Sequence, residues 1–79
     1  MGSQATRQEI GQAIGEIIKR KRNEKGYSVY KLSMVTFGNS YHANAIADYE
    51  KGVKIPDIEK LNKILLSLDL NIFEILKNY

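Results

Sequence analysis

The sequence predicts an all-α fold, a compact five-helix domain that takes up the whole chain of 79 residues. Apolar residues recur at the three- and four-residue spacing of amphipathic helices. Four of the five periodic segments begin at Thr, Ser, Asp or Asn and several end at Gly, which is typical of helix boundaries. No alternating pattern of useful length indicates a strand. We expect one domain over residues 1–79, with residues 1–5 disordered or an expression scar.

The first helix is expected to begin at Thr6, which forms a capping box with Glu9. Gly26 supplies a left-handed stop at its end. The apolar face that this helix would bury consists of Ile10, Ile14, Ile17 and Ile18.

The next two helices form a pair joined by a tight turn. Ser28 caps the second helix, which would bury Val29, Leu32 and Val35 and close near Phe37 and Gly38. After the turn 38–40, the third helix runs from about His42 to Lys51 and ends at Gly52. Its inward-facing residues are Ile46 and Tyr49.

Two further helices follow the loop 53–56. Asp57 caps the fourth, and Asn71 with Glu74 starts a short fifth. The residues expected to pack in the fourth helix are Ile58, Leu61, Ile64, Leu65 and Leu68. The fifth helix bears Ile72, Phe73, Ile75, Leu76 and Tyr79.

Several functional classes are excluded by composition. The chain has no cysteine and one histidine, so disulfides and metal clusters are not expected. No apolar run approaches the roughly 20 residues of a membrane span. The single histidine has no obvious acidic partner and there is no glycine-rich phosphate loop, so we expect no enzyme activity, no catalytic residues and no cofactor. A cytoplasmic location fits these features.

Positive charge gathers toward the N-terminal part. The net charge is +3, and residues 1–55 hold nine Lys and Arg against five Asp and Glu, including the run Lys19-Arg20-Lys21-Arg22. A clustered positive field attracts a polyanion such as duplex DNA. The alternative is a solvated helix end, because cations also favour helix C-termini.

One ordered set of residues runs through nearly the whole chain: Ile14, Gly15, Ile18, Arg22, Gly26, Tyr27, Ser28, Leu32, Ile46, Glu50, Gly52, Pro56, Leu61, Ile64, Leu68, Phe73 and Leu76. This set resembles the lambda-repressor-like, or XRE-type, helix-turn-helix regulators, over about residues 12–77. The chain departs from the family pattern at Val29, where a glutamine is common, and in an enlarged turn between Leu32 and Ile46.

The resemblance implies a sequence-specific regulator that binds double-stranded DNA, most simply a repressor acting as a homodimer on a two-half-site operator. Arg22 and Glu50 would form a partly buried ion pair that ties the first helix to the third. The alternative is that Arg22 is another phosphate-facing cation. The remaining alternatives are an antitoxin of the same fold that binds a toxin protein, and the DNA-binding head of a longer peptide-sensing regulator.

Base reading is expected from the third helix. Asn44 is the strongest candidate because an amide can bind adenine N6 and N7 together; alternatively it only caps its own helix. Tyr41 and His42 would assist from the turn. The predicted base-reading set is Ala43, Asn44, Ala45, Ala47 and Asp48.

Other residues would position the domain on DNA or join two copies of it. Phosphate contacts are expected from Lys19, Arg20, Ser28, Tyr30, Lys31, Ser40, Lys51 and Lys54. The last helix carries more apolar residues than it needs internally, so a two-fold interface is expected from Ile72, Phe73, Ile75, Leu76 and Tyr79.

Overall fold

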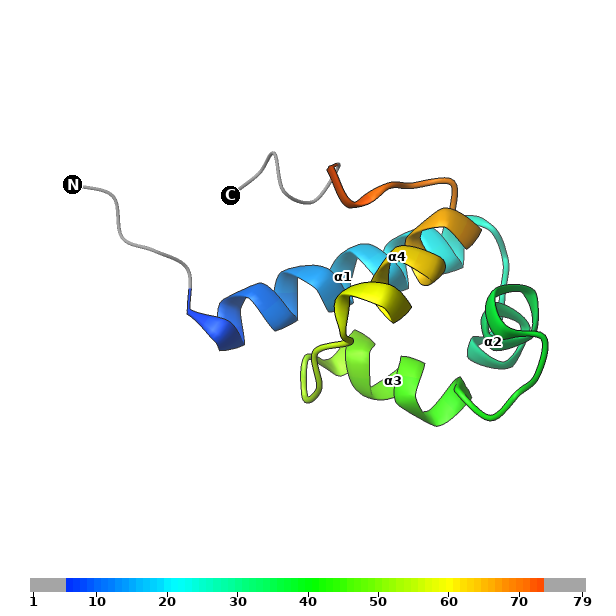
Figure 1. Cartoon of the computed structure of the whole chain (residues 1–79), viewed down its shortest axis with the longest axis horizontal. Coiled ribbons are helices and arrows are strands. Elements are labelled where there is room, and N and C mark those ends of the chain that lie inside the picture. The colour runs from blue at the N-terminus through cyan, green and yellow to red at the C-terminus, as the bar shows by residue number, and fades with distance from the viewer. Residues whose placement is uncertain (1–5, 74–79) are drawn as a thin grey trace.

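The computed structural model describes residues 6–73, within which there are four helices and no strand (Figure 1). The helices are α1 (Arg7–Glu24), α2 (Val29–Phe37), α3 (Ala43–Lys51) and α4 (Ile58–Ser67). The all-α prediction is confirmed, but the predicted count of five helices is not matched. Of the expected fifth helix, only Ile72 and Phe73 have described helical backbone, and its remaining residues lie outside the described range.

None of the helices in this part of the chain combines the length and the apolar character that a membrane crossing requires.

Three helices begin where the sequence predicts, because a side chain there accepts a backbone hydrogen bond. The Thr6 hydroxyl accepts from the Glu9 N–H at 3.1 Å, and the Glu9 carboxylate accepts from the Thr6 N–H at 3.0 Å. Ser28 and Asp57 cap α2 and α4 in the same way, at 2.9 and 2.8 Å. Such caps satisfy N–H groups that the first helical turn leaves without partners.

Left-handed glycines set the ends of α2 and α3. Gly38 has φ +80° and Gly52 has φ +77°, a conformation that a residue with a Cβ adopts only at a cost. The backbone N–H of each glycine returns to a carbonyl of its own helix. These two glycines end the two helices of the predicted pair, Gly38 before the turn into α3 and Gly52 after α3.

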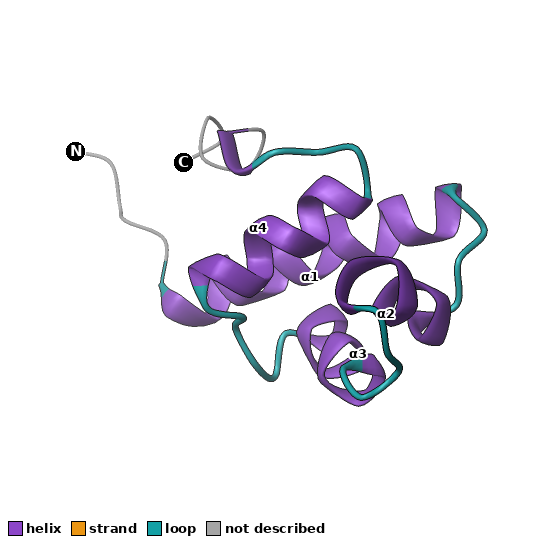
Figure 2. Ribbon diagram, turned by 45° about the vertical axis from the view of Figure 1, so that its right-hand side comes forward, coloured by secondary structure: helices purple, strands orange, loops and turns teal. Residues whose placement is uncertain are grey.

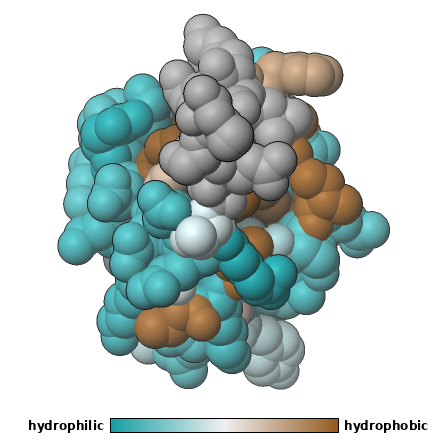
Figure 3. All heavy atoms as spheres, turned by 90° about the vertical axis from the view of Figure 1, so that its left-hand side faces the viewer, coloured by the Kyte–Doolittle hydropathy of each residue, from teal (hydrophilic) through white to brown (hydrophobic). Residues whose placement is uncertain are grey.

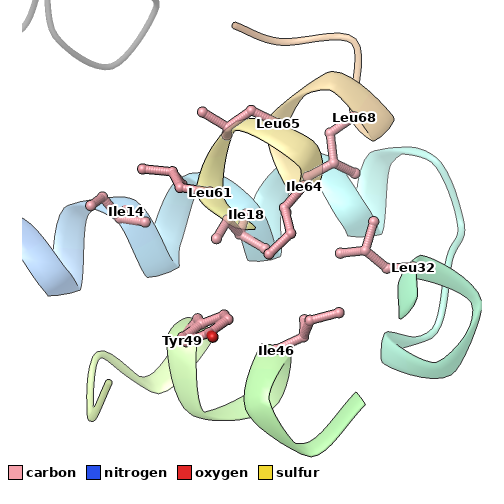
Figure 4. Close-up of a cluster of buried hydrophobic side chains, with 9 residues drawn as sticks. All are labelled: Ile14, Ile18, Leu32, Ile46, Tyr49, Leu61, Ile64, Leu65 and Leu68. Atoms are coloured by element: carbon pink, nitrogen blue, oxygen red, sulfur yellow. The ribbon is translucent and has the colours of Figure 1, made fainter. Parts of the chain in front are cut away.

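One hydrophobic cluster joins all four helices (Figure 4). Ile10 and Ile17 pack at its margin. Two residues predicted to be buried are not: Val35 is 44% exposed and Ile58 is 67% exposed. The buried members are Ile14, Ile18, Leu32, Ile46, Tyr49, Leu61, Ile64, Leu65 and Leu68.

The helix packing places α3 beneath α1. α1 packs against α3, and α2 packs against both α3 and α4 (Figure 2). Gly15 allows the close approach of α1 to α3, because a Cβ there would lie 2.2 Å from the carbonyl oxygen of Tyr49. α3 is therefore held against α1 backbone to backbone.

The surface mixes apolar and polar side chains. On the face shown in Figure 3, the hydrophobic atoms lie in separate patches among hydrophilic ones. Large apolar side chains that are more than half exposed include Tyr41, Val53, Ile58 and Phe73.

Candidate nucleic-acid interface

The inner face of α3 is buried in the core. Ile46 is 0% exposed and Tyr49 is 8% exposed, and Figure 4 shows both side chains pointing from α3 toward the other helices. Ala43 is 2% exposed, so the prediction that it reads bases is wrong. It lies three residues before Ile46, which puts both on one face of a helix; that spacing was the signal for its burial.

An ion pair between Arg22 and Glu50 fixes the C-terminal end of α3 to α1. Arg22 Nε donates to Glu50 Oε2 at 2.6 Å, and Nη2 donates to Oε1 at 2.9 Å. The third guanidinium nitrogen, Nη1, donates to the Tyr27 carbonyl at 2.6 Å. The side chains are 14% and 7% exposed, and the hydrogen bonds to Glu50 raise the pKa of Arg22 above its ordinary value. The predicted contact between Arg22 and Glu50 is confirmed. All three guanidinium nitrogens of Arg22 are bonded within the protein, which argues against the alternative that Arg22 faces a phosphate.

The outer face of α3 presents a small polar surface. Asn44 is exposed, while Ala47 and Asp48 are half-buried. Asp48 Oδ2 lies 3.6 Å from Lys54 Nζ, so a cation partly offsets its negative charge. Ala45 is also half-buried but packs against the core cluster, which leaves it a small contribution to this surface. Asn44 is therefore the most accessible of the five predicted base-reading residues.

The connection between α2 and α3 is held by one buried hydroxyl. Ser33 in α2 is 0% exposed; its Oγ donates to the Asn39 carbonyl at 2.5 Å and accepts from the His42 N–H at 3.2 Å. The Asn39 side chain accepts from the Tyr41 N–H at 3.0 Å. Reasoning from the sequence missed Ser33, because nothing in its local pattern shows that a turn will fold back onto it.

Tyr41 and His42, the two predicted turn contacts, have different environments. Tyr41 is 90% exposed. His42 is half-buried, and its ring lies 4.0 Å from the Phe37 ring, centroid to centroid. His42 occupies the N-cap position of α3 without making a side-chain cap bond, whereas the other three described helices have one.

The residues predicted to contact phosphates come from three helices and from the three loops that connect the four helices. Lys19 and Arg20 are exposed on α1, and Lys51 and Lys54 are exposed at and after the end of α3. The Ser28 hydroxyl accepts the cap bond of α2, and its O–H is left as a donor. The other exposed members of the set are Tyr30, Lys31 and Ser40.

Of the five residues predicted to form a dimer interface, two are described. Phe73 is 73% exposed and Ile72 is half-buried against the core cluster. Ile75, Leu76 and Tyr79 lie outside the described residues.

No protein-family model, curated protein or solved structure matches this chain.

Proposed function

We propose that this chain is a sequence-specific regulator that binds double-stranded DNA, a lambda-repressor-like helix-turn-helix domain that acts as a repressor. In this proposal α2 and α3 are the helix pair, and α3 is the helix that enters the major groove.

The observation that carries the proposal is the contrast between the two sides of α3. Its inner side is fixed by Ile46 and Tyr49 in the core and by the pair of Glu50 with Arg22. Its outer side carries an exposed amide, Asn44, on the first turn. A rigid helix with a polar, accessible face is what base reading in the major groove requires.

The charge around the helix pair supports a polyanionic partner. Residues 25–47 contain Lys25 and Lys31 but no Asp or Glu. The start of α3 has no side-chain cap, and although the Ala43 N–H bonds the Ser40 carbonyl, the helix dipole favours an anion at this end. Lys51 and Lys54 add exposed cations around the end of the same helix.

A homodimer is the expected binding form. Phe73, one of the predicted two-fold interface residues, is a large apolar side chain that is 73% exposed. Two copies would place their α3 helices on half-sites about one helical turn, 10–10.5 base pairs, apart.

The test is the salt dependence of binding to a duplex selected from a randomised pool. Because bound cations displace counterions from DNA, the logarithm of the association constant should fall with the logarithm of salt, with a slope of about −0.9 per neutralised phosphate. Lys31→Ala should make the slope shallower by about one unit and weaken all sequences alike. A slope near zero would refute the proposal.

The base-reading part is tested separately with Asn44→Ala. Loss of the amide should cost about 1–3 kcal/mol on the selected duplex and flatten discrimination at one base pair per half-site. Binding to unrelated duplexes should change little. If Asn44→Ala keeps the full preference of the wild type, Asn44 does not read bases.

A toxin-binding antitoxin is the second candidate function. It is favoured by Tyr30 and Met34, which are 61% and 49% exposed and lie four residues apart on α2, where they form an apolar strip. In that case Met34→Ser, which keeps the predicted phosphate contact Tyr30, should leave DNA binding intact and weaken binding to the product of the neighbouring gene.

A further inference from the structure

The loop between α2 and α3 has a fixed conformation, because buried and half-buried side chains form hydrogen bonds with its backbone. Ser33 Oγ bonds to backbone groups on both sides of the turn, at Asn39 and at His42. The Asn39 carboxamide bonds the backbone on each side of itself, to Phe37 and to Tyr41. The turn therefore has one defined backbone shape before any partner arrives.

At the outside of this turn stands the most exposed of the large apolar side chains in residues 6–73. Tyr41 is 90% exposed, against 73% for Phe73 and 67% for Ile58. A tyrosine on a fixed backbone has two rotatable χ angles, so ordering it on binding costs little entropy. A small entropy cost on binding is typical of an anchor residue at an interface.

Two observations favour nucleic acid over protein as the partner of Tyr41. Tyr41 lies two residues before the start of α3 and three before the exposed Asn44. The surrounding stretch, residues 25–47, contains no acidic residue that would repel phosphates. In Figure 1 the turn between α2 and α3 lies at the end of the molecule away from the start of α1.

We infer that Tyr41 is a specificity-determining contact of this domain, whose ring packs against the deoxyribose and thymine methyl groups at the edge of each half-site, and that Ser33 is the positioning residue that holds it there. This inference rests on the proposed DNA-binding function. It adds a reading element outside α3 with a stated preference, for thymine, at a base pair that α3 does not contact.

The experiment measures the affinity of wild type and variants for one duplex selected from a randomised pool, and for a copy in which the outermost thymine of each half-site is replaced by cytosine. Tyr41→Ala should lower affinity for the selected duplex about tenfold, the loss of one anchor side chain. The Tyr41→Ala variant should bind the selected duplex and its cytosine-substituted copy with nearly equal affinity. Tyr41→Phe keeps the ring and should stay within about twofold of wild type.

Ser33→Ala tests the positioning role through a double-mutant cycle. If Ser33 fixes the turn, Tyr41→Ala should cost about threefold in the Ser33→Ala background rather than about tenfold in the wild type, because residues coupled through one hydrogen-bonded turn do not act additively. The urea unfolding transition of each variant is measured as a control that all four proteins of the cycle are folded. Equal losses in both backgrounds would refute the positioning role of Ser33.

Different results would contradict the proposed DNA binding and the inferred Tyr41 contact. Wild-type protein that shows no salt-dependent binding to any duplex overturns the DNA-binding function and this inference together. Wild-type protein that binds while Tyr41→Ala binds equally well overturns only the inference about Tyr41. If Tyr41→Phe loses as much as Tyr41→Ala, the hydroxyl and not the ring makes the contact, which also contradicts the ring packing inferred here.

Discussion

Gly15 sets the distance between α1 and α3, and this gives a test at the scale of one residue. A Cβ at Gly15 would lie 2.2 Å from the Tyr49 carbonyl oxygen and 2.9 Å from that of Glu50. Because both obstacles are backbone, Gly15→Ala must push the helices apart, and we expect a loss of about 1–3 kcal/mol of unfolding free energy. Urea denaturation measures it.

Gly11→Ala is the matched control, one turn earlier on α1. There the nearest atom is 3.0 Å away in the flexible side chain of Ile55, so the neighbour can move. Alanine also has the higher helix propensity, by about 1 kcal/mol. Gly11→Ala should be near neutral, and equal effects at the two glycines would contradict the close approach at Gly15.

The contact of Arg22 with Glu50 gives a second prediction. Glu50→Ala leaves a guanidinium that is 14% exposed without its carboxylate, which should cost about 3–5 kcal/mol in unfolding free energy. DNA affinity should fall for every sequence alike, because α3 loses its orientation and no base contact is removed. Glu24→Ala breaks the surface pair with Lys21 and should cost less than about 1 kcal/mol.

If Glu50→Ala unfolds like the wild type while selectivity changes at a single base pair, Glu50 reads DNA and the structural role is wrong. Thermal melting and binding to a panel of duplexes distinguish the two outcomes.

Residues with local partners could be predicted from the sequence, and those with distant partners could be predicted only in part. The caps at Thr6 and Ser28 depend on atoms three residues away, so the pattern contains all the chemistry they need. Ser33 depends on a turn six and nine residues further on, whose path no local pattern specifies. Arg22 and Glu50 are 28 residues apart and were predicted only through a family resemblance.

At the scale of an element, the caps of α1 and α4 make stability depend on pH. The pKa of Asp57 lies below its ordinary 3.8, mainly because the Lys60 N–H donates to the carboxylate. The pKa of Glu9 lies below 4.5 because the Thr6 N–H donates to it. A lowered folded-state pKa gives stability that is fully present above the unfolded-state value and is lost as the pH falls through the folded value.

We therefore expect the urea midpoint to fall as the pH drops below about 4.5, with Asp57 and Glu9 among the groups responsible. Asp57→Ser is the informative variant: serine still caps α4 but does not titrate in this range. It should weaken the acid dependence while it leaves the helix intact. An unchanged acid dependence in Asp57→Ser would show that this cap does not contribute to it.

Periodicity predicted which face of each helix points inward, but not how far along the helix a neighbour is present. Leu61, Ile64 and Leu65 are buried as their spacing requires. Ile58 follows the same spacing but occupies the first residue of α4, and it is 67% exposed. Whether the first turn of a helix is covered depends on the lengths and crossing of the other helices, which its own sequence does not contain.

At the scale of the whole molecule, association is tested with Phe73→Glu. Phe73 is 73% exposed, so a charge there should leave the monomer folded, with an unchanged urea midpoint, but should disrupt an apolar two-fold contact. Analytical ultracentrifugation should show a monomer, with much weaker binding to a two-half-site duplex. Ile58→Glu is a control of similar exposure, 67%, outside the predicted interface. Wild-type protein that stays monomeric at high concentration and on DNA would refute the homodimer.

The two attachments of α3 to α1 restrict how this domain can be regulated. Gly15 and Arg22 lie seven residues apart on α1, about two helical turns, and both meet the last turn of α3: Gly15 at the Tyr49 and Glu50 carbonyls, Arg22 at the Glu50 side chain. Because Ile46 is also buried in the core one turn earlier, α3 can neither slide nor rotate without breaking one of these contacts. An inhibitor is therefore expected to occlude the outer face of α3 by direct competition, so that the apparent Kd for DNA rises in proportion to inhibitor concentration without the plateau that a finite allosteric coupling imposes.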